Sequence, residues 1–201
     1  MFLMKMNNKF ENQAGFSVGG FILEFFQSIV LALSVFVLVY LFVAQPNEVK
    51  GNSMLPNFTN GEYLLTDKIS YQLGEPQVGD VVVFKAPPSE PCSAEECEYI
   101  KRIRAKAGDT AMVKGGKLYV NGQLINETFL PAEYVSEPGS YLQEGVEKTI
   151  PQGEFLCLGD NRSHSRDGRE FGPIKKSLIV GRAFFKYWPV TSVGLVPKIR
   201  I

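Results

Sequence analysis

The sequence is poor in the residues that most often serve as general bases and metal ligands. It contains one histidine, His164, and three cysteines among its 201 residues. Cys92 and Cys97 lie in a Pro- and Glu-rich stretch typical of a solvated loop, where an oxidising compartment could join them in a disulfide. Zinc sites need more ligands than this chain offers, so we expect no metal and no cofactor. Cys157 is expected to be a buried core thiol.

An excess of charge of either sign is also absent. The 21 basic and 21 acidic side chains cancel, and no basic stripe with interleaved aromatic residues is present. We therefore expect no nucleic-acid partner. The apolar content of 45% is ordinary for a chain that buries one core, so a single folded domain with appendages is the simplest organisation.

The chain does contain one long apolar run. No charged residue occurs from Ile29 to Ala44, and extension back to Phe21 gives about 24 residues with only three polar interruptions. Such a run is long enough to cross a bilayer core of about 30 Å as a helix. A buried helix of a soluble domain is the alternative, but it rarely lacks a polar face so completely. A cleavable signal peptide fits poorly, because cleavage after Ala44 would place Phe42 where a small residue is required.

The charges around this run predict its orientation. Lys5 and Lys9 precede it, which favours a cytoplasmic N-terminus in the cell membrane. We therefore expect a cytoplasmic tail at residues 1–20, a single transmembrane signal anchor at 21–44 and an extracytoplasmic domain at 45–201. Ser53 is the ninth residue after Ala44, so it would lie within about 30 Å of the bilayer. The lipid bilayer is therefore an expected partner.

After Pro46 the sequence changes to short β-like segments separated by turn signals. Asn121-Gly122 is the strongest of these signals and predicts a tight hairpin. The fold class expected is mostly β, with one N-terminal transmembrane helix. The expected strands are 63–66, 80–85, 99–104, 110–113, 117–120, 123–125, 155–158 and 178–188.

Ser53 lies in VKGNSMLPNF (49–58), where Gly, Asn and Pro could form a simple turn or could present a nucleophile. A nucleophilic serine needs a base to take its proton. His164 could form a triad with Asp160 or Asp167 on paper, although a histidine in an exposed loop is commonplace.

A lysine is the other candidate base, provided that burial keeps its amine neutral near pH 7. Lys101, in EYIKRIR, meets this condition best because Tyr99 and Ile103 share its face of the expected strand. The alternative is an edge-strand lysine whose amine reaches water.

Five segments in order resemble those of the bacterial type I signal peptidases, which are membrane-anchored Ser/Lys endopeptidases. They cover residues from about 49 to 188 and read VKGNSMLPNF, NGEYLLTDK, VGDVVVFK, YIKRIRAKAGD and LGDNRSHSRDGREFG. The resemblance implies a Ser-Lys protease fold, with Ser53 as the nucleophile and Lys101 as the general base. It also implies removal of signal peptides from exported preproteins after a small residue, through an acyl-enzyme and without metal or cofactor.

The resemblance extends to residues that support the dyad. Ser165 matches a serine that positions the lysine amine, and Asp167 matches an aspartate that organises its loop, with Arg102 and Arg169 as ion partners. The backbone N–H of Ser53 is expected to stabilise the oxyanion.

Gly51 stands where some members carry a serine hydroxyl as the second oxyanion donor, so here that donor must be backbone, water or absent. An extended substrate would bind as an added strand in shallow apolar pockets. The matching positions, which could equally be core residues, are Val49, Met54, Phe58, Tyr99 and Ile100.

Two other functions are compatible with the sequence. One is a different Ser/Lys processing peptidase, such as that of a conjugation system, and the other is a non-catalytic membrane-anchored β-domain that binds peptides. The self-cleaving SOS-type repressors are disfavoured by the apolar run within residues 1–48. The aromatic run 183–189 is either a terminal core strand or an apolar rim for the membrane interface.

Overall fold

The computed structural model describes residues 18–91, 97–131 and 133–199. The expectations for residues 1–17 and for Cys92 lie outside this part. The chain divides into two compact units at Val39/Tyr40, and each is described by itself.

The first unit consists of most of α1 (Val18–Phe42), a helix that is apolar on all sides. Its segment Val18–Tyr40 has a mean hydropathy of 2.4 and is long enough to cross a membrane. Within it the Ser28 and Ser34 hydroxyls donate hydrogen bonds to the carbonyl oxygens four residues earlier, at 2.9 and 2.8 Å. The helix therefore satisfies these polar groups internally, as a bilayer would require. It ends at Phe42, two residues before the expected boundary.

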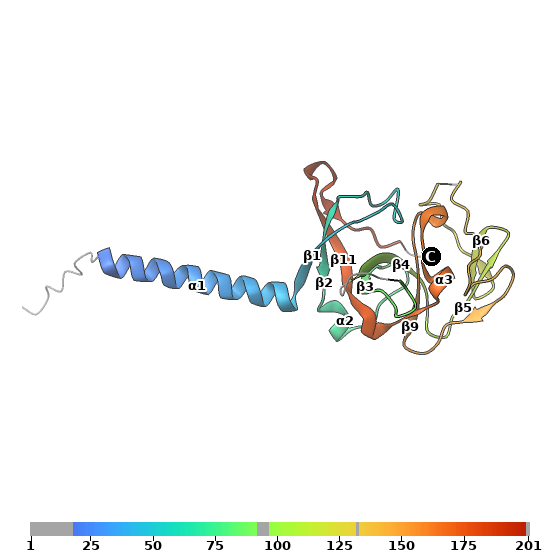
Figure 1. The fold of residues 1–201 in the computed structure, drawn as a ribbon, viewed down its shortest axis with the longest axis horizontal. Coiled ribbons are helices and arrows are strands. Elements are labelled where there is room, and N and C mark those ends of the chain that lie inside the picture. Colours follow the sequence, from blue (N-terminus) through green and yellow to red (C-terminus); the bar gives the residue numbers. More distant parts are fainter. Residues whose placement is uncertain (1–17, 92–96, 132, 200–201) are drawn as a thin grey trace, which may run out of the picture. The chain divides into compact units, whose positions relative to one another are not determined.

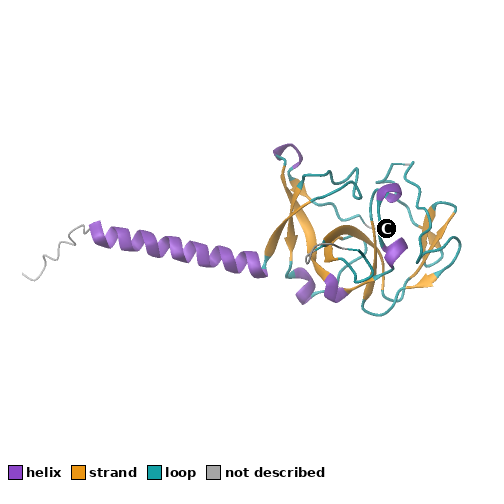
Figure 2. Ribbon diagram, in the orientation of Figure 1, coloured by secondary structure: helices purple, strands orange, loops and turns teal. Residues whose placement is uncertain are grey.

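The second unit is built mainly of antiparallel strands, which confirms the expectation of a mostly-β fold (Figures 1 and 2). Its larger sheet has the order β1-β2-β11-β3-β4-β9-β10, and β12 pairs with β11. The strands of this sheet are β1 (Ala44–Glu48), β2 (Tyr63–Asp67), β3 (Val81–Lys85), β4 (Glu98–Lys106), β9 (Glu154–Leu158), β10 (Ile174–Lys175), β11 (Ile179–Trp188) and β12 (Gly194–Leu195).

A smaller sheet with the order β7-β6-β5-β8 lies at the end of this unit away from β1 and β2 (Figure 1). Its strands are β5 (Thr110–Lys114), β6 (Lys117–Val120), β7 (Gln123–Leu124) and β8 (Lys148–Thr149). The turn between β6 and β7 is the predicted one, since Asn121 and Gly122 both have positive φ, at 52° and 74°.

Several short elements were not predicted. They are α2 (Ser70–Leu73), α3 (Gly168–Phe171), the strands β1, β8, β10 and β12, and three short 3-10 helices at 162–164, 176–178 and 190–192. β1 contains Pro46, which disfavours a strand unless it lies at a sheet edge, and β1 is indeed an edge strand.

Three buried apolar clusters hold the second unit together, and one of them lies beneath the segment that carries Ser53. Its buried members are Val49, Met54, Phe58, Leu64, Val81 and Ala183. The aromatic run belongs to β11. Ala183 is buried, whereas Trp188 at the end of the strand is 52% exposed. The core role is thus observed for the start of this run, and a membrane role for its end stays a prediction.

Candidate active site

Ser53 lies in the loop between β1 and β2, and short-range hydrogen bonds fix the shape of this loop. The Val49 amide donates to Glu62 O and the Gly61 amide donates to Val49 O, both at 2.8 Å. Gly51 has a φ of 87°, a conformation that residues with a Cβ rarely adopt. Its amide donates to Asn60 Oδ1 at 2.8 Å. This N–H is therefore engaged, and Gly51 cannot serve as the second oxyanion donor through its backbone.

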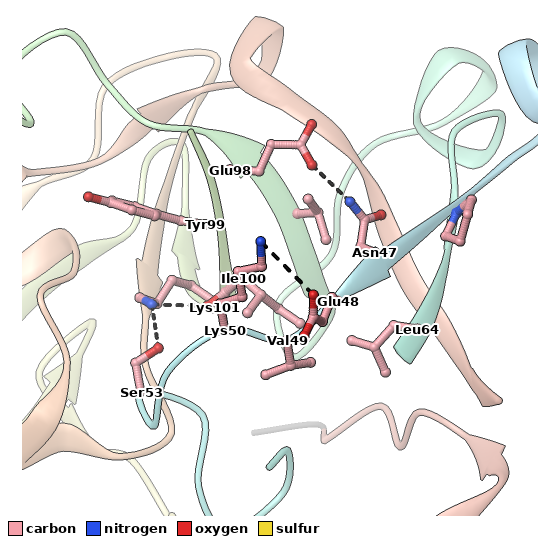
Figure 3. A pocket seen from close by; sticks show the side chains of 12 residues that line it. Asn47, Glu48, Val49, Lys50, Ser53, Leu64, Glu98, Tyr99, Ile100 and Lys101 are labelled. Carbon is pink, nitrogen blue, oxygen red and sulfur yellow. Dashed lines mark hydrogen bonds and ion pairs between the residues drawn. The ribbon is translucent and has the colours of Figure 1, made fainter. Parts of the chain in front are cut away.

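Lys101 lies on β4 and reaches Ser53 directly. Its Nζ is 2.7 Å from Ser53 Oγ and 3.1 Å from the carbonyl oxygen of Ile100 (Figure 3). The side chain is buried with 5% exposure, and Nζ lies 5.5 Å from the centre of the Tyr99 ring. Burial lowers the pKa of the amine from its ordinary value to about 8, although the Asp167 carboxylate acts in the opposite direction. The amine is thus poised to accept the hydroxyl proton near neutral pH.

Tyr99 and Ile103 flank Lys101 on β4 as expected, although the residues on the other face, Arg102 and Arg104, are buried as well. Ile103 is fully buried, and Tyr99 packs with Phe84 and Phe171 at ring-centre distances of 6.0 and 6.2 Å. These apolar groups on one face of β4 exclude water from the lysine stem. They supply the physical cause of the lowered pKa.

The polar segment after β9 forms hydrogen bonds with the loop that carries Ser53. The Asn161 amide donates to Ser53 O at 2.9 Å, and Asn161 Nδ2 donates to Asn52 O at 3.1 Å. Asn57 Nδ2 also donates to Asp160 Oδ2, at 2.9 Å. Sequence reasoning did not select Asn57 or Asn161, although the run of polar residues after a buried strand was a usable signal.

The ion pairs around this segment correct one expectation. Arg102 is fully buried and pairs with Asp160, not with Asp167, at 2.9 Å from Nε and 2.7 Å from Nη2. Asp167 instead pairs with Arg169 at 2.9 Å and accepts the Gly159 amide at 3.0 Å. Asp160 lies two residues after the end of β9, which pairs with β4, so its carboxylate is the one that reaches Arg102.

Ser165 and His164 follow in the same segment. The Ser165 hydroxyl is buried and has no hydrogen-bond partner among the residues that the structure describes. It packs on Gly159, where any added Cβ would collide with it. A role in positioning the Lys101 amine therefore remains a proposal. His164 is exposed, and its Nδ1 faces Asn161 Oδ1 at 3.4 Å. With Asp160 and Asp167 paired to arginines, the Ser-His-Asp triad considered above does not form.

A cavity of about 300 Å³ opens beside the dyad (Figure 3). Of the expected substrate-binding residues, Val49, Tyr99 and Ile100 line it. Met54 and Phe58 do not line it, and both are 1% exposed in the cluster beneath the loop. The remaining lining residues are Pro46, Asn47, Glu48, Lys50, Ser53, Leu64, Val83, Glu98 and Lys101. Three of the unexpected ones, Pro46, Asn47 and Glu48, come from β1, which was not predicted as a strand.

One edge of β4 is available beside this cavity. β4 pairs with β3 from Glu98 to Arg102 but pairs with β9 only from Arg102 onward. The edge formed by residues 98–101 can therefore accept an extended peptide as an additional strand.

The cysteines and possible metal ligands complete the description. Cys97 is disulfide-bonded, and Cys157 is a free buried thiol whose pKa is raised by burial. Within the described residues, no group of three or more His, Cys, Asp or Glu side chains is placed to hold a metal ion.

The chain is similar to several known proteins. Residues 22–188 match the family model described as signal peptidase, peptidase S26. The signal peptidase IB of Staphylococcus aureus (strain COL) is 34% identical over 182 residues, which cover 85% of this chain and 92% of that protein. The probable signal peptidase I-2 of Synechocystis sp. is 34% identical over 176 residues, covering 87% and 77%.

Thylakoidal processing peptidase 1 of Arabidopsis thaliana is 38% identical over 168 residues, which cover 81% of this chain. The chain spans about half the length of that plant protein, since the match covers 47% of it. A solved signal peptidase I from Enterococcus faecalis matches with 24% identity and a TM-score of 0.43, over 54% of this chain and 97% of that one. The family match and the bacterial relatives confirm the resemblance found in the sequence, and the chain belongs to the signal peptidase family, peptidase S26.

Proposed function

We propose that this chain is a membrane-anchored serine endopeptidase that removes signal peptides from exported preproteins after a small residue. The observation that carries the proposal is the 2.7 Å separation between Lys101 Nζ and Ser53 Oγ beside a cavity with an open strand edge. A domain that only binds peptides would have no need of a buried lysine beside a serine hydroxyl. The names of the bacterial relatives favour signal peptides over the substrates of a conjugation system.

The reaction begins when Ser53 Oγ attacks the carbonyl carbon of the scissile bond while Lys101 Nζ takes the hydroxyl proton. The backbone N–H of Ser53 donates to the oxyanion of the tetrahedral intermediate. Collapse of this intermediate breaks the C–N bond, and the Lys101 ammonium gives its proton to the leaving amine. A water molecule then attacks the ester, Lys101 again accepts a proton, and Ser53 is regenerated as the signal peptide carboxylate leaves.

The substrate lies as an added strand along residues 98–101 of β4 in this proposal. Its small side chains at the first and third positions before the scissile bond enter the apolar part of the cavity formed by Val49, Leu64 and Ile100. Larger side chains would collide with these residues, which are anchored in the core. This arrangement accounts for a preference for Ala-X-Ala-like sequences.

The proposed location is the cytoplasmic membrane, with a cytoplasmic N-terminus, α1 as the single anchor and the catalytic unit outside the cytoplasm. The apolar composition of α1 supports this placement. The short connection from Phe42 to Ser53 then keeps the nucleophile near a substrate that is itself anchored by an apolar segment.

The test uses the purified full-length protein in detergent with a preprotein substrate. Ser53→Ala and Lys101→Met should each reduce processing by at least about a thousandfold, as expected for loss of a nucleophile or its base. Ser192→Ala and Lys176→Met, which lie outside the cavity lining, are matched controls and should retain full activity. Unchanged processing by both dyad variants would refute the assignment.

A further inference from the structure

The end of the cavity farthest from Ser53 carries a fixed carboxylate. Glu98 begins β4, and its Oε2 accepts a 2.8 Å hydrogen bond from Asn47 Nδ2 on β1 (Figure 3). Asn47 is itself oriented, because its Oδ1 accepts a 2.8 Å hydrogen bond from the hydroxyl of Thr66. Thr66 is fully buried in β2. These two hydrogen bonds connect the Glu98 carboxylate to a buried residue of the sheet and fix its position in the cavity wall.

This carboxylate has no cation partner in the part of the chain that the structure describes. Lys85 lies opposite Glu98 in the β3–β4 register, yet no ion pair joins the two side chains. Lys50 Nζ lies 3.9 Å from Glu48 Oε2, and the Lys50 side chain is 81% exposed, so this ion pair is weak. Lys50 forms no ion pair with Glu98. Lys101 reaches Ser53 at the opposite end of the cavity. Glu98 therefore offers the cavity a carboxylate that has no ion-pair partner among the described residues.

The position of Glu98 relative to the dyad sets which substrate residue it faces. It lies three residues before Lys101 on β4, which corresponds to about 10 Å along a strand. Val49 and Ile100, which take the small side chains in the proposed function, lie between the two ends of the cavity (Figure 3). A peptide paired with this edge would thus place its fourth or fifth residue before the scissile bond beside Glu98.

We propose that Glu98 forms an acidic subsite that selects a basic side chain at the fourth or fifth residue before the scissile bond. The inference rests on the proposed function, because it assigns the substrate preference of the same cavity. A lysine or arginine side chain gains a partly desolvated carboxylate partner there, whereas an acidic side chain meets a like charge. The preference adds to the requirement for small residues closer to the scissile bond.

The experiment compares peptide substrates that share an Ala-X-Ala cleavage sequence and differ only at the fourth or the fifth residue before the scissile bond. Each position carries Lys, Gln or Glu in turn, and kcat/KM is measured with the full-length protein in neutral detergent at low salt. The wild type should favour Lys over Glu at one of the two positions by about fivefold or more, and 0.5 M salt should reduce the ratio.

Two variants of Glu98 assign the preference to this residue. Glu98→Gln should bring the Lys/Glu ratio close to one, and Glu98→Lys should reverse it, a result that general damage to the fold cannot produce. Glu75→Gln removes an exposed carboxylate outside the cavity lining and should leave the wild-type ratio unchanged. The inference is overturned if the wild type shows no preference at either position, or if the preference persists in Glu98→Gln.

The Gln substrates separate this inference from the proposed function. Their cleavage by the wild type shows that the peptidase activity stands whatever the charge preference. Failure of the wild type to cleave any of the peptides or a preprotein would instead refute the proposed function and, with it, the acidic subsite.

Discussion

The backbone amide of Asn161 donates a hydrogen bond to the carbonyl oxygen of Ser53 at 2.9 Å, so the segment after β9 contacts the nucleophile residue directly. The Asn161 side chain adds a second bond, from Nδ2 to Asn52 O at 3.1 Å. Lys101 and Asn161 thus both hydrogen-bond to Ser53, one at its side chain and the other at its backbone. The position of the nucleophile depends on two elements that are distant in the sequence.

The Asn161→Ala variant removes the side-chain bond and keeps the backbone bond. We expect kcat to fall about tenfold with little change in KM, because the loop that orients Ser53 loosens while the cavity is untouched. The loss of stability should be about 1 kcal/mol. Steady-state kinetics and thermal unfolding check both values against Asn126→Ala, which changes an exposed asparagine that follows β7. An unchanged kcat would show that the backbone bond alone positions the serine.

The buried pair of Arg102 and Asp160 should be sensitive to removal of one partner. Arg102→Met leaves the Asp160 carboxylate buried without its charge partner, and we expect destabilisation by about 3–5 kcal/mol. Adding Asp160→Asn to this variant should recover part of the loss, because the isolated charge is gone. Thermal unfolding of the four proteins of the cycle gives the coupling. A loss as small as that of the exposed pair of Lys176 and Glu75 would contradict the buried, bidentate geometry.

Burial of the Lys101 amine should cost stability at neutral pH. Its pKa is about 8 in the folded protein and near the ordinary 10.5 when unfolded, so the unfolded state holds the proton more tightly. The penalty is fully present below about pH 8 and disappears as the pH rises to about 10.5. Its size is on the order of 3 kcal/mol.

The Lys101→Met variant should therefore be more stable than the wild type at pH 7, and the difference should shrink between pH 8 and pH 10.5. Thermal unfolding at a series of pH values measures this difference. A variant that is less stable than the wild type at pH 7, or a difference that does not change with pH, would mean that the amine is well solvated in the folded protein.

The longer strands of the β-rich unit could be predicted from local patterns, and the Ser53–Lys101 dyad from the resemblance of five ordered segments to the type I signal peptidases. Alternation along EYIKRIR placed Lys101 on the same face as Tyr99 and Ile103, and Asn121-Gly122 identified the β6–β7 turn. The strand β1 could not be predicted in this way. Its residues, which include Pro46 and Asn47, have low strand propensity, and only pairing with β2 makes them a strand.

The errors in the site have a common physical origin. The segment after β9 offers both Asp160 and Asp167 to Arg102, and the choice between them depends on how that segment packs against β4. Met54 flanks the nucleophile and is apolar, so the sequence cannot distinguish a cavity wall from the core beneath it. The hydrogen bond between Asn47 and Glu98 could not be predicted from the sequence either. β1 and β4 are not neighbours in the sheet, so their contact depends on how the sheet curves.

The most direct test of the account is the dependence of kcat/KM on pH for the full-length protein with a signal-peptide substrate. Because Lys101 must be neutral to accept the Ser53 proton, the rate should be low at pH 5 and rise to a plateau with an apparent pKa of about 8. A rate that stays flat from about pH 5 to pH 9 would contradict a lysine base, and with it the Ser53–Lys101 mechanism.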